Sequence, residues 1–569
     1  MDKIKEYIKK ALSELGYEIF EDQIIVERPG EEKFGDYSTS VAMILAKRER
    51  INPVELANKL KHKLDEITDK TELIEKIEVA GAFVNFYLKN EYLIKKAEEL
   101  NYEIEFLKRM SNYGKGKTVV IDYSAPNIAK PFGIGHLRST DIGQAILNIY
   151  KLLGWKTMGD NHLGDWGTQF GKLIVAIKKW GDKPVDKMSI GDLERLYVKF
   201  HKESENSPEL IEEGREWFAK LEDKDEEARK IWQQCVDLSI KEFNRVYEML
   251  GVKIDFAHGE SFYEDMLPTI VKELEEKKVA IESQGALIVE FGDMPPAMVQ
   301  KTNKTTTYLT RDLATIKYRL ENWKPDLIIY EVGADQTLHF KQLFSIAKMM
   351  NWVPKTGLVH IAHGLIRWPS GKFSTRKGDT IHLEEVIDRA MKEAERLATG
   401  STVAKDLSPE EKTNMIKAVA IGAIKFNDLA ADPKRDIIFD WERVMNLEGN
   451  SGPYLQYTYA RCLSVLNKTR VREQKNILSV PEIVQAEEVS LLKLLAGWEE
   501  RILESAERFM PSIIADQLIK TARAFNEFYA KYRIVDNKDE DWRVFLTKST
   551  ASGLKLGLKL LGIETVDRM

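Results

Sequence analysis

The chain has 569 residues, of which 43% are hydrophobic and 31% charged, a composition typical of globular proteins. This length exceeds what one hydrophobic core supports, so we expect roughly three or four domains. The formal net charge of −6 excludes a chain that is basic throughout, and any nucleic-acid-binding surface must therefore be local.

The cysteines Cys235 and Cys462 are far apart and form no CxxC pair, which excludes a disulfide framework and a cysteine zinc site. Their scarcity favours a reducing compartment, and we expect a cytoplasmic protein. No apolar run reaches the ~18 residues of a membrane span. The charged start "MDKIKEYIKKAL" is helical in period and is not typical of a signal peptide.

Residues 1–110 mix helical and strand patterns, which predicts a small α+β domain. The run "PVELANKLKHKLDEI" has the period of an amphipathic helix, and "AFVNFYL" is typical of a strand.

Residues 111–385 alternate short β-branched runs, such as "TVVIDY", "LIIYEVG" and "GLVHIAHG", with helical ones. This alternation predicts a Rossmann-type parallel sheet, whose ligands bind beyond the carboxyl ends of the strands. Within it, residues from about 172–260 are charged and helical in period, which predicts a helical insertion. We expect a helical connecting region at 386–450 and an all-α bundle at 451–569. The predicted fold is therefore multidomain α/β.

The stretch "SAPNIAKPFGIGHLRST" joins the first of these strands to a helix. Gly133 and Gly135 would let a ligand approach the backbone closely, and the helix N-terminus that follows suits phosphate. The spacing matches neither a dinucleotide fingerprint nor a P-loop. A turn of this kind is often only structural, but Asn127, Lys130 and His136 add polar groups that favour a nucleotide site.

A second loop, "SGKFSTRKGDT" at residues 370–380, combines glycine and serine with cations. Such a loop could close over a triphosphate and neutralise charge as pyrophosphate leaves. A lysine-rich loop alone is usually solvated surface. Here the loop favours a nucleotide site because it follows the first motif in the sequence and both motifs lie on a parallel α/β pattern.

The first stretch resembles the first nucleotide-binding motif of class I aminoacyl-tRNA synthetases, in the form typical of arginyl-tRNA synthetases, and the second loop resembles their second motif. The family usually carries a histidine where this chain has Gly133. The resemblance implies an ATP site formed by Gly133, Gly135, His136, Lys372 and Ser374. It also implies a catalytic group of His136, Lys372, Ser374 and Arg376, supported by Lys377 and Lys130.

A guanidinium group needs carboxylate and carbonyl acceptors in planar geometry. The segments "YLTRDLA", "VGADQTLHFKQLF" and "VIDYSAPN" offer such acceptors and closely resemble segments of the arginine pocket in that family. The resemblance implies a pocket of Asp122, Ser124, Asn127, Tyr308, Asp312 and Gln336. Tyr308 and Asp312 would face the guanidinium with help from Gln336, while Ser124 and Asn127 would hold the α-amino and carboxylate end.

The segment "GDNHLGDWGTQFGKL" also matches the family. We assign His162 and Gln169 no catalytic role. A His–Asp pair there has no third ligand at a plausible spacing, so we expect no resident metal.

The segment "GPYLQYTYARCLSVLNKTRVR" mixes aromatic faces with cations, which suits unpaired RNA bases, although single tyrosines could equally be helix core. It resembles the start of the family's anticodon-binding bundle. The candidate tRNA contacts are Tyr454, Gln456, Tyr457 and Arg461. Residues 1–110 resemble the amino-terminal module that touches the tRNA elbow.

The resemblance implies an arginine–tRNA ligase that activates L-arginine with ATP, accompanied by Mg²⁺, and transfers it to the 3′-terminal adenosine of tRNA(Arg). We expect a monomer that acts in the cytoplasm. Two alternatives stay open. One is a class I ligase for another amino acid, and the other is a non-catalytic, tRNA-binding regulatory paralogue, which the glycine at position 133 favours.

Overall fold

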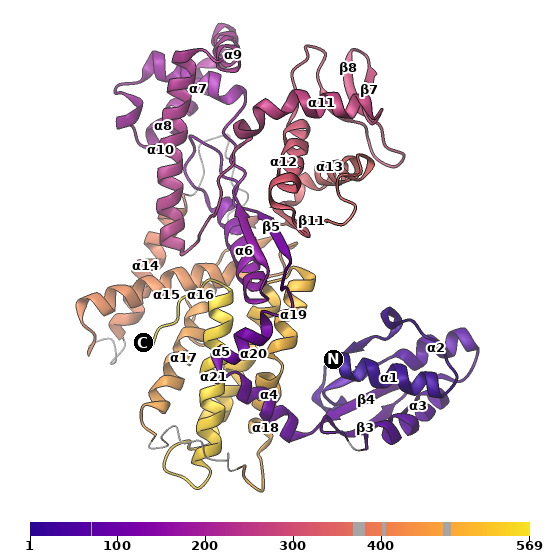
Figure 1. The fold of residues 1–569 in the computed structure, drawn as a ribbon. Helices are drawn as coiled ribbons and strands as arrows, with labels where there is room; N and C mark the ends of the chain where they lie inside the picture. Colours follow the sequence, from indigo (N-terminus) through magenta and orange to yellow (C-terminus); the bar gives the residue numbers. More distant parts are fainter. Residues whose placement is uncertain (70, 368–381, 401–405, 470–479) are drawn as a thin grey trace. The chain divides into compact units, whose positions relative to one another are not determined.

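The computed structural model describes residues 1–69, 71–367, 382–400, 406–469 and 480–569. The chain divides into two compact units (Figure 1). The first comprises Met1–Phe106, Cys462–Leu503 and Ile519–Leu554, and the second comprises Leu107–Arg461, Glu504–Leu518 and Lys555–Met569. No helix in the described part of the chain has both the length and the apolar character that crossing a membrane requires.

The amino-terminal part of the first unit is an antiparallel sheet covered by helices. The strand order is β1 (Val26–Glu27), β2 (Tyr37–Thr39), β4 (Phe83–Leu88) and β3 (Ile74–Ala80). Helix α3 (Pro53–Thr68) packs on β3 and β4, while α1 (Asp2–Glu14) and α2 (Val41–Glu49) pack on α3. Helix α3 begins at Pro53 because proline is preorganised for the first helical position and the Asn52 side chain caps the next two N–H groups.

The rest of the first unit is helical and draws on both ends of the chain. The helices that lie wholly or partly in it are α4 (Asn90–Glu99), α5 (Glu103–Met110), α17 (Gly452–Leu466), α18 (Ala486–Ala496), α19 (Trp498–Arg508), α20 (Ser512–Lys531) and α21 (Glu540–Leu560). Helix α18 packs against α4. Large side chains such as Trp498, Trp542 and Phe525 are buried between the helices and form their core.

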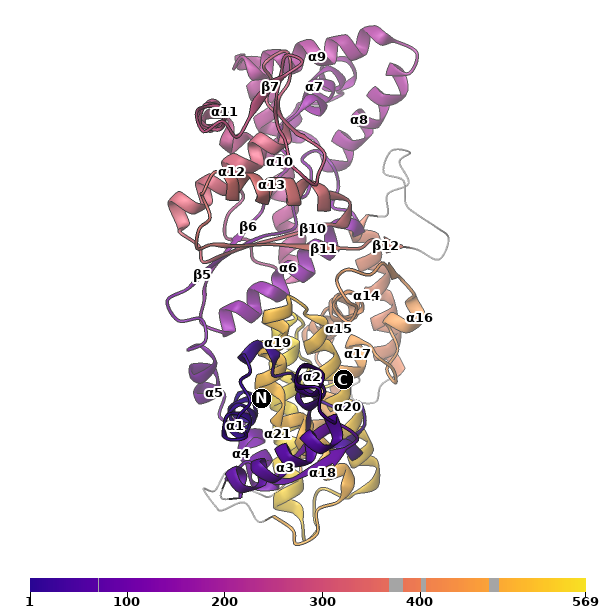
Figure 2. The same ribbon diagram turned by 90° about the vertical axis from the view of Figure 1, so that its right-hand side faces the viewer.

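The second unit is built on a parallel sheet with the strand order β11 (Gly357–His363), β10 (Leu327–Gly333), β5 (Thr118–Asp122) and β6 (Lys156–Asp160). Helix α6 (Ile134–Leu152) lies on one face, and α12 (Tyr308–Trp323) and α13 (Thr337–Met349) lie on the other (Figure 2). The core on the second face includes Val120, Ile328 and Leu313. The strand order reverses between β5 and β10, and parallel sheets bind ligands at such a switch point.

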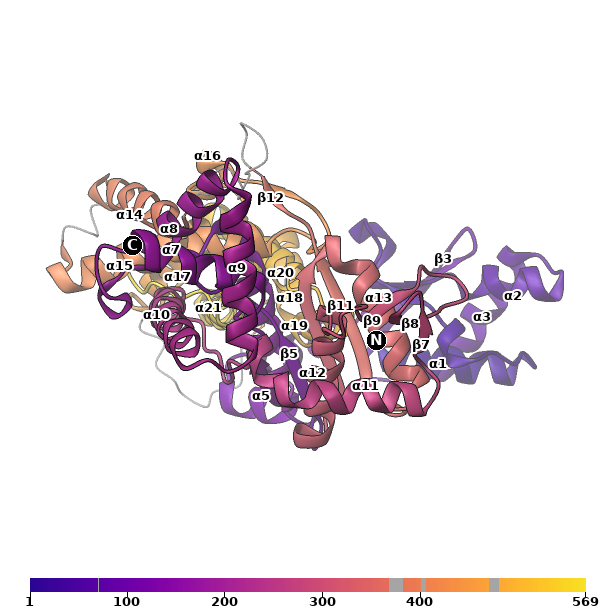
Figure 3. The same ribbon diagram turned by 90° about the horizontal axis from the view of Figure 1, so that it is seen from above.

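A long insertion separates β6 from β10. Helices α7 (Thr168–Trp180), α8 (Ile190–Ser204), α9 (Pro208–Glu222) and α10 (Glu226–Leu250) pack on one another (Figure 3). The chain then forms α11 (Leu267–Glu276) and an antiparallel sheet of β7 (Ile281–Ser283), β8 (Ala286–Val289) and β9 (Ala297–Gln300) before α12.

After β11 the chain forms β12 (Ile366–Arg367), α14 (Leu383–Gly400), α15 (Pro409–Leu429), β13 (Ile437–Ile438) and α16 (Trp441–Val444), then enters α17. The described residues also form the short 3₁₀ helices η1 (Glu21–Gln23), η2 (Glu32–Phe34), η3 (Val185–Lys187), η4 (Glu260–Met266) and η5 (Ala334–Gln336). The predicted fold class, a parallel-sheet catalytic domain with an α+β amino-terminal part and a helical carboxy-terminal part, is confirmed.

Candidate functional site

The turn after β5 is held in an unusual backbone conformation. Ser124 and Ala125 have φ angles of 75° and 44°, in the left-handed region that side chains rarely adopt. The Ser124 N–H donates to Ser139 Oγ at 2.9 Å, and the Ser124 hydroxyl contacts Tyr247 Oη at 2.8 Å. The Ala125 N–H donates to Asn161 Oδ1 at 2.9 Å. Buried polar side chains from α6, from α10 and from the loop after β6 therefore fix this turn, and Ser124 itself is buried.

The N-terminal turn of α6 carries the first predicted phosphate contacts. Gly133 is its N-cap, and the Gly133 N–H donates to Nδ1 of His136 at 3.2 Å. In a neutral ring the proton is then on Nε2. Burial, with a contribution from the charge of Lys130, lowers the pKa of His136 to about 4. At neutral pH His136 is therefore an uncharged donor. Nothing lies near the position that a Cβ of Gly135 would occupy, which leaves room for a ligand.

A cavity of about 200 Å³ opens beside this turn. It is lined by Asn127, Ile128, Ala129, Lys130, Gln169, Phe170, Leu173, Tyr197 and Tyr308. It brings two predicted residues of the first stretch, Asn127 and Lys130, together with Tyr308, which is far from them in the sequence. The Lys130 ammonium lies 5.5 Å from the ring centroid of Tyr197, a cation–π distance.

Asp312 lies one helical turn after Tyr308 on α12, and two histidines face it. His339 Nε2 is 2.6 Å from Asp312 Oδ2, and His162 Nε2 is 3.5 Å from Asp312 Oδ1. Burial lowers the pKa of His339, but the hydrogen bond and charge of Asp312 outweigh it and the net pKa is raised. Gln336 is exposed in η5, just before the helix that carries His339. The carboxylate of Asp312 could thus bind a cation, but in the structure it already contacts His339 and His162.

Glu260, in η4, is a carboxyl near Asp312 that the sequence analysis does not predict. Its Oε2 is buried and has no hydrogen-bond partner among the described residues. Burial and the negative charges of Asp312 and Asp165 raise the pKa of Glu260 to about 8, against the lowering effect of Arg311. A second carboxyl near the half-buried Asp312 is an arrangement that a guanidinium would satisfy. No spacing in "AHGESFYED" signals this role, because the neighbours of Glu260 are brought to it by tertiary structure.

Asp122 lies behind the pocket instead of lining it. Arg319 on α12 is fully buried and donates to Asp122 Oδ2 at 2.6 Å and to Asp160 Oδ2 at 2.8 Å. The two carboxylates end neighbouring strands, so Arg319 ties the ends of β5 and β6 to α12. Asp122, which the sequence analysis predicts as an arginine-binding residue, therefore binds Arg319 of the protein itself.

The residues predicted from the second loop, Lys372, Ser374, Arg376 and Lys377, lie outside the described residues. The described chain stops at Arg367, the last residue of β12, and resumes at His382.

The candidate RNA contacts lie on α17. Tyr454, Tyr457 and Arg461 are half-buried and share one face by their spacing, and the Arg461 guanidinium carbon is 4.8 Å from the Tyr457 ring centroid. Gln456 differs from them. It is fully buried, and its amide donates to the carbonyl oxygens of Ala418 at 2.9 Å and Glu564 at 2.8 Å. Its geometry is that of a structural contact.

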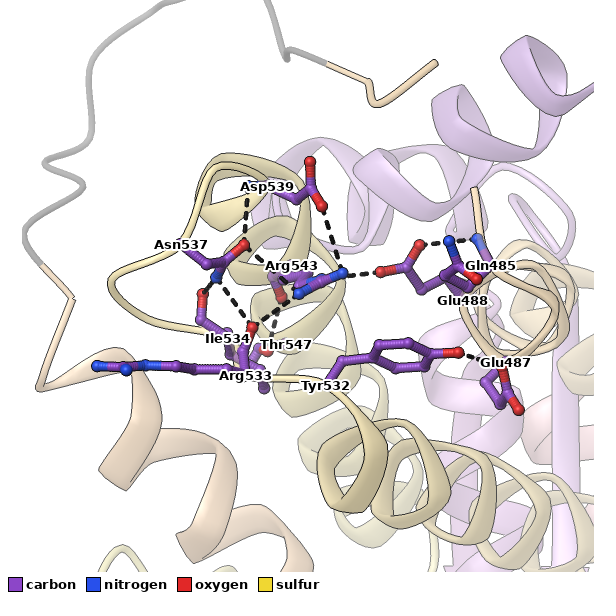
Figure 4. A network of polar contacts seen from close by, with 10 residues as sticks. All are labelled: Gln485, Glu487, Glu488, Tyr532, Arg533, Ile534, Asn537, Asp539, Arg543 and Thr547. Carbon is purple, nitrogen blue, oxygen red and sulfur yellow. Dashed lines mark hydrogen bonds and ion pairs between the residues drawn. The ribbon is translucent and has the colours of Figure 1, made fainter. Parts of the chain in front are cut away.

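A polar network joins α18, α21 and the segment between α20 and α21 in the first unit (Figure 4). Arg543 is its centre. Its guanidinium donates to Glu488 at 3.0 Å, to the carbonyl oxygen of Arg533 at 2.9 Å and to Asp539 at 3.3 Å. Asn537 also donates to the Arg533 carbonyl, at 2.9 Å. Because Glu488 is buried, removal of Arg543 would leave its charge unpaired.

We expect Arg543→Met to lower the free energy of unfolding of this bundle by about 2 kcal/mol, within the range for lost hydrogen bonds to charged groups. Arg533→Ala is the matched control, because the Arg533 side chain is largely exposed and its loss should change stability by less than about 0.5 kcal/mol. Hydrogen exchange of peptides from α18 and α21 in increasing denaturant would measure both. Equal losses of stability in the two variants would contradict the assignment of Arg543 as the centre of this polar network.

Three family profiles match the chain in succession. Residues 2–88 match the arginyl tRNA synthetase N terminal domain, residues 104–441 match the catalytic domain of class I (R) tRNA synthetases, and residues 455–569 match the DALR anticodon binding domain.

Curated relatives and solved structures agree with these profiles. An arginine–tRNA ligase of Halothermothrix orenii is 39% identical, with 100% of this chain and 99% of the relative covered, and one of Clostridium perfringens is 38% identical with the same coverage. The arginyl-tRNA synthetase structure of Plasmodium falciparum superposes with a TM-score of 0.83 at 25% identity, covering 100% of this chain and 99% of that one. That of Thermus thermophilus, at 23% identity, superposes with a TM-score of 0.82 over 100% of both chains.

Proposed function

Because the chain belongs to the arginyl-tRNA synthetase family, we propose that it joins L-arginine to tRNA(Arg) at the carboxyl edge of its parallel sheet. The arginine carboxylate attacks the α-phosphorus of ATP, which forms arginyl-adenylate and releases pyrophosphate. A hydroxyl of the 3′-terminal adenosine of the tRNA then attacks the arginyl carbonyl and releases AMP. The observation that carries this proposal is a cavity lined by Asn127, Lys130 and Tyr308 beside the phosphate-suited N-terminus of α6. The Asp312 carboxylate lies one helical turn after Tyr308 on α12.

For arginine, we assign the guanidinium to Asp312 and Glu260, with Tyr308 and Gln336 beside them. Two carboxylates can take a planar guanidinium through charge-assisted hydrogen bonds. Asn127 and the turn at Ser124 would hold the α-amino and carboxylate end, since Asn127 lines the cavity next to α6. Asp122 acts through Arg319, which fixes the position of the ends of β5 and β6 relative to α12.

For ATP, we assign the phosphates to the N–H groups at Gly133 and Gly135, to the His136 donor and to Lys130. Lys372, Ser374, Arg376 and Lys377 would neutralise the pyrophosphate as it leaves. Mg²⁺ would arrive with ATP, and the donors around α6 fit phosphate oxygens and not a bare cation, since they are N–H groups and a lysine. The reaction needs no covalent enzyme intermediate, because it proceeds by positioning and charge stabilisation.

For tRNA, we assign the anticodon arm to the helices of residues 451–569, with Tyr454, Tyr457 and Arg461 as contacts and Gln456 as the internal tie of α17. We assign the tRNA elbow to residues 1–110. The family match over 2–88 and 455–569 supports both. We further propose that the protein acts as a monomer in the cytoplasm, where tRNA charging supplies translation.

Charging of unfractionated tRNA by the purified protein, with ATP and each labelled amino acid in turn, tests the proposal. We expect arginine alone to be transferred, and Lys372→Ala to abolish or sharply reduce the transfer. Charging of another amino acid would show a class I ligase of different specificity. Binding of tRNA without any charging would show a regulatory paralogue in which Gly133 reflects a lost activity.

The raised pKa of Glu260 makes arginine binding depend on pH. In the free protein the carboxyl is mostly protonated below pH about 8, while a bound guanidinium needs the carboxylate. Binding must therefore release a proton. We expect KM for arginine to fall by up to about tenfold for each unit of pH up to about 8, and then to level off. Initial rates across pH in the wild type and in Glu260→Gln would test this, and a wild-type slope that persists in Glu260→Gln would exclude Glu260 as its source.

A further inference from the structure

Arg138 lies on α6 two residues after His136 and is almost fully buried. Its Nε is 3.2 Å from Asp428 Oδ1 on α15. Its Nη1 donates to the carbonyl oxygen of Arg435 at 2.6 Å, and its Nη2 donates to that of Asp432 at 3.3 Å. One guanidinium thus joins the phosphate-facing end of α6 to α15 and to the segment that follows α15.

The segment that follows α15, residues 432–438, pairs with the part of the chain that comes after the last strand of the parallel sheet. Its strand β13 pairs in parallel with β12 through Ile366 with Ile437 and Arg367 with Ile438. Asp436 accepts from the N–H of Leu365 and from Nε of Arg367, both at 2.7 Å. In the sequence, Arg367 lies three residues before Ser370, the first residue of the second phosphate motif. The carbonyl groups that Arg138 binds therefore belong to the segment that anchors the approach to that motif.

The charges around Asp428 explain why an arginine occupies this position. Asp428 is buried, and the titratable groups that interact with it are Arg138, His363, Glu331 and Asp141. Asp141 is itself paired with Lys425. His363 Nδ1 is paired with Glu331 Oε1 at 2.8 Å. Arg138 is thus the cation that remains for Asp428, and its planar fork can serve the carboxylate and two carbonyl groups at once. A lysine, with a single nitrogen, could not span these three acceptors.

We propose that Arg138 is a positioning residue for adenylate formation, because it fixes the first turn of α6 relative to the β12–β13 pair that leads to the second phosphate motif. This inference rests on the proposed function, in which both motifs bind one ATP. Phosphoryl transfer depends on such positioning, and small displacements of the binding groups are costly in rate.

A second buried ion pair between the same helices provides an internal control. One turn further along α6, Asp141 Oδ1 lies 4.0 Å from Lys425 Nζ on α15, and both side chains are fully buried. The Lys425 ammonium donates to the carbonyl oxygens of Leu250 at 2.7 Å and Gly562 at 2.8 Å, which close the ends of α10 and α21. This pair secures the packing of helix ends, and its contacts lead away from the β12–β13 segment.

The test compares Arg138→Lys with Lys425→Met in ATP–pyrophosphate exchange with tRNA(Arg) present, together with thermal unfolding of each full-length variant. We expect Arg138→Lys to lower kcat at least tenfold, with KM for arginine changed less than twofold. Lys425→Met should lower the melting temperature but keep kcat per folded molecule within twofold. Should Arg138→Lys keep kcat, or Lys425→Met lose it equally, the positioning role is wrong and the contacts are only structural.

Asp436→Ala keeps the proposal testable if Arg138→Lys does not fold, because Asp436 is exposed and its loss should be tolerated. We expect at least a threefold lower kcat with arginine affinity retained, whereas an unchanged kcat would overturn the proposal. Absence of exchange in the wild type would instead refute the proposed function, so the two failures are distinguishable.

Discussion

Asp312→Asn is expected to lower kcat/KM for arginine about 1000-fold. The substitution keeps the size of the side chain but replaces a charged acceptor by a neutral amide that also presents donors toward the guanidinium. Truncating one member of a desolvated, hydrogen-bonded charge pair costs about 4 kcal/mol, which corresponds to roughly this factor. Initial rates of arginylation as a function of arginine concentration would measure the effect.

The matched control is Asp335→Asn. Asp335 undergoes the same chemical change on an exposed residue of η5, next to Gln336, and should leave kcat/KM within twofold of the wild type. Comparable losses in the two variants would show that negative charge near the cavity acts at long range and that Asp312 has no special contact with the substrate.

The structure supports the assignment of specificity to more than one carboxyl. His339 and His162 partner Asp312 in the protein, so the site holds positive or donor groups where the guanidinium is expected. A substrate would exchange these contacts for its own. Specificity then comes from Glu260, whose buried Oε2 has no hydrogen-bond partner among the described residues and would stay unpaired with a wrong amino acid. This penalty is larger than that of a missing methylene.

Three strands of the parallel sheet could be predicted from the sequence because buried parallel strands are short apolar runs. β5, β10 and β11 fall within the three predicted runs. β6, with the sequence "KTMGD", was not predicted, because it has no β-branched apolar run. The small sheet of β7, β8 and β9 was also not predicted, since its short strands are stabilised by pairing and not by their own pattern.

Residue patterns alone predict the site only where its chemistry is local in the chain, whereas Tyr308 was predicted from the resemblance of its segment to the family. The turn from Ser124 to His136 carries its own glycines and polar groups, and the cavity indeed brings Asn127, Lys130 and Tyr308 together. Glu260 and Arg138 depend on contacts between elements distant in the sequence, which no spacing reveals. The sequence predicts Gln456 as an RNA contact because it stands between tyrosines. In the helix its side chain instead points into the core, where it donates to the carbonyl oxygen of Ala418.

His136→Ala is expected to lower kcat for adenylate formation about 100-fold to 1000-fold, the usual cost of removing a preorganised donor to a developing negative charge. The structure predicts which ring form acts. Nδ1 accepts the Gly133 N–H, so the neutral ring presents Nε2–H, and the lowered pKa of about 4 keeps it neutral above pH about 5. The rate should therefore show no histidine titration between pH 6 and pH 7.

His136→Gln separates charge from hydrogen bonding, because its amide can donate near the Nε2 position but is never charged. We expect it to retain more activity than His136→Ala and to have the same pH profile as the wild type, measured by pyrophosphate exchange. A wild-type rate that falls as pH rises through 6–7, absent from His136→Gln, would show that the imidazolium is the active form. In that case bound ATP must raise the pKa of His136. The positive charge of its ring would then contribute to phosphate binding, in a motif where Gly133 replaces the family's first histidine.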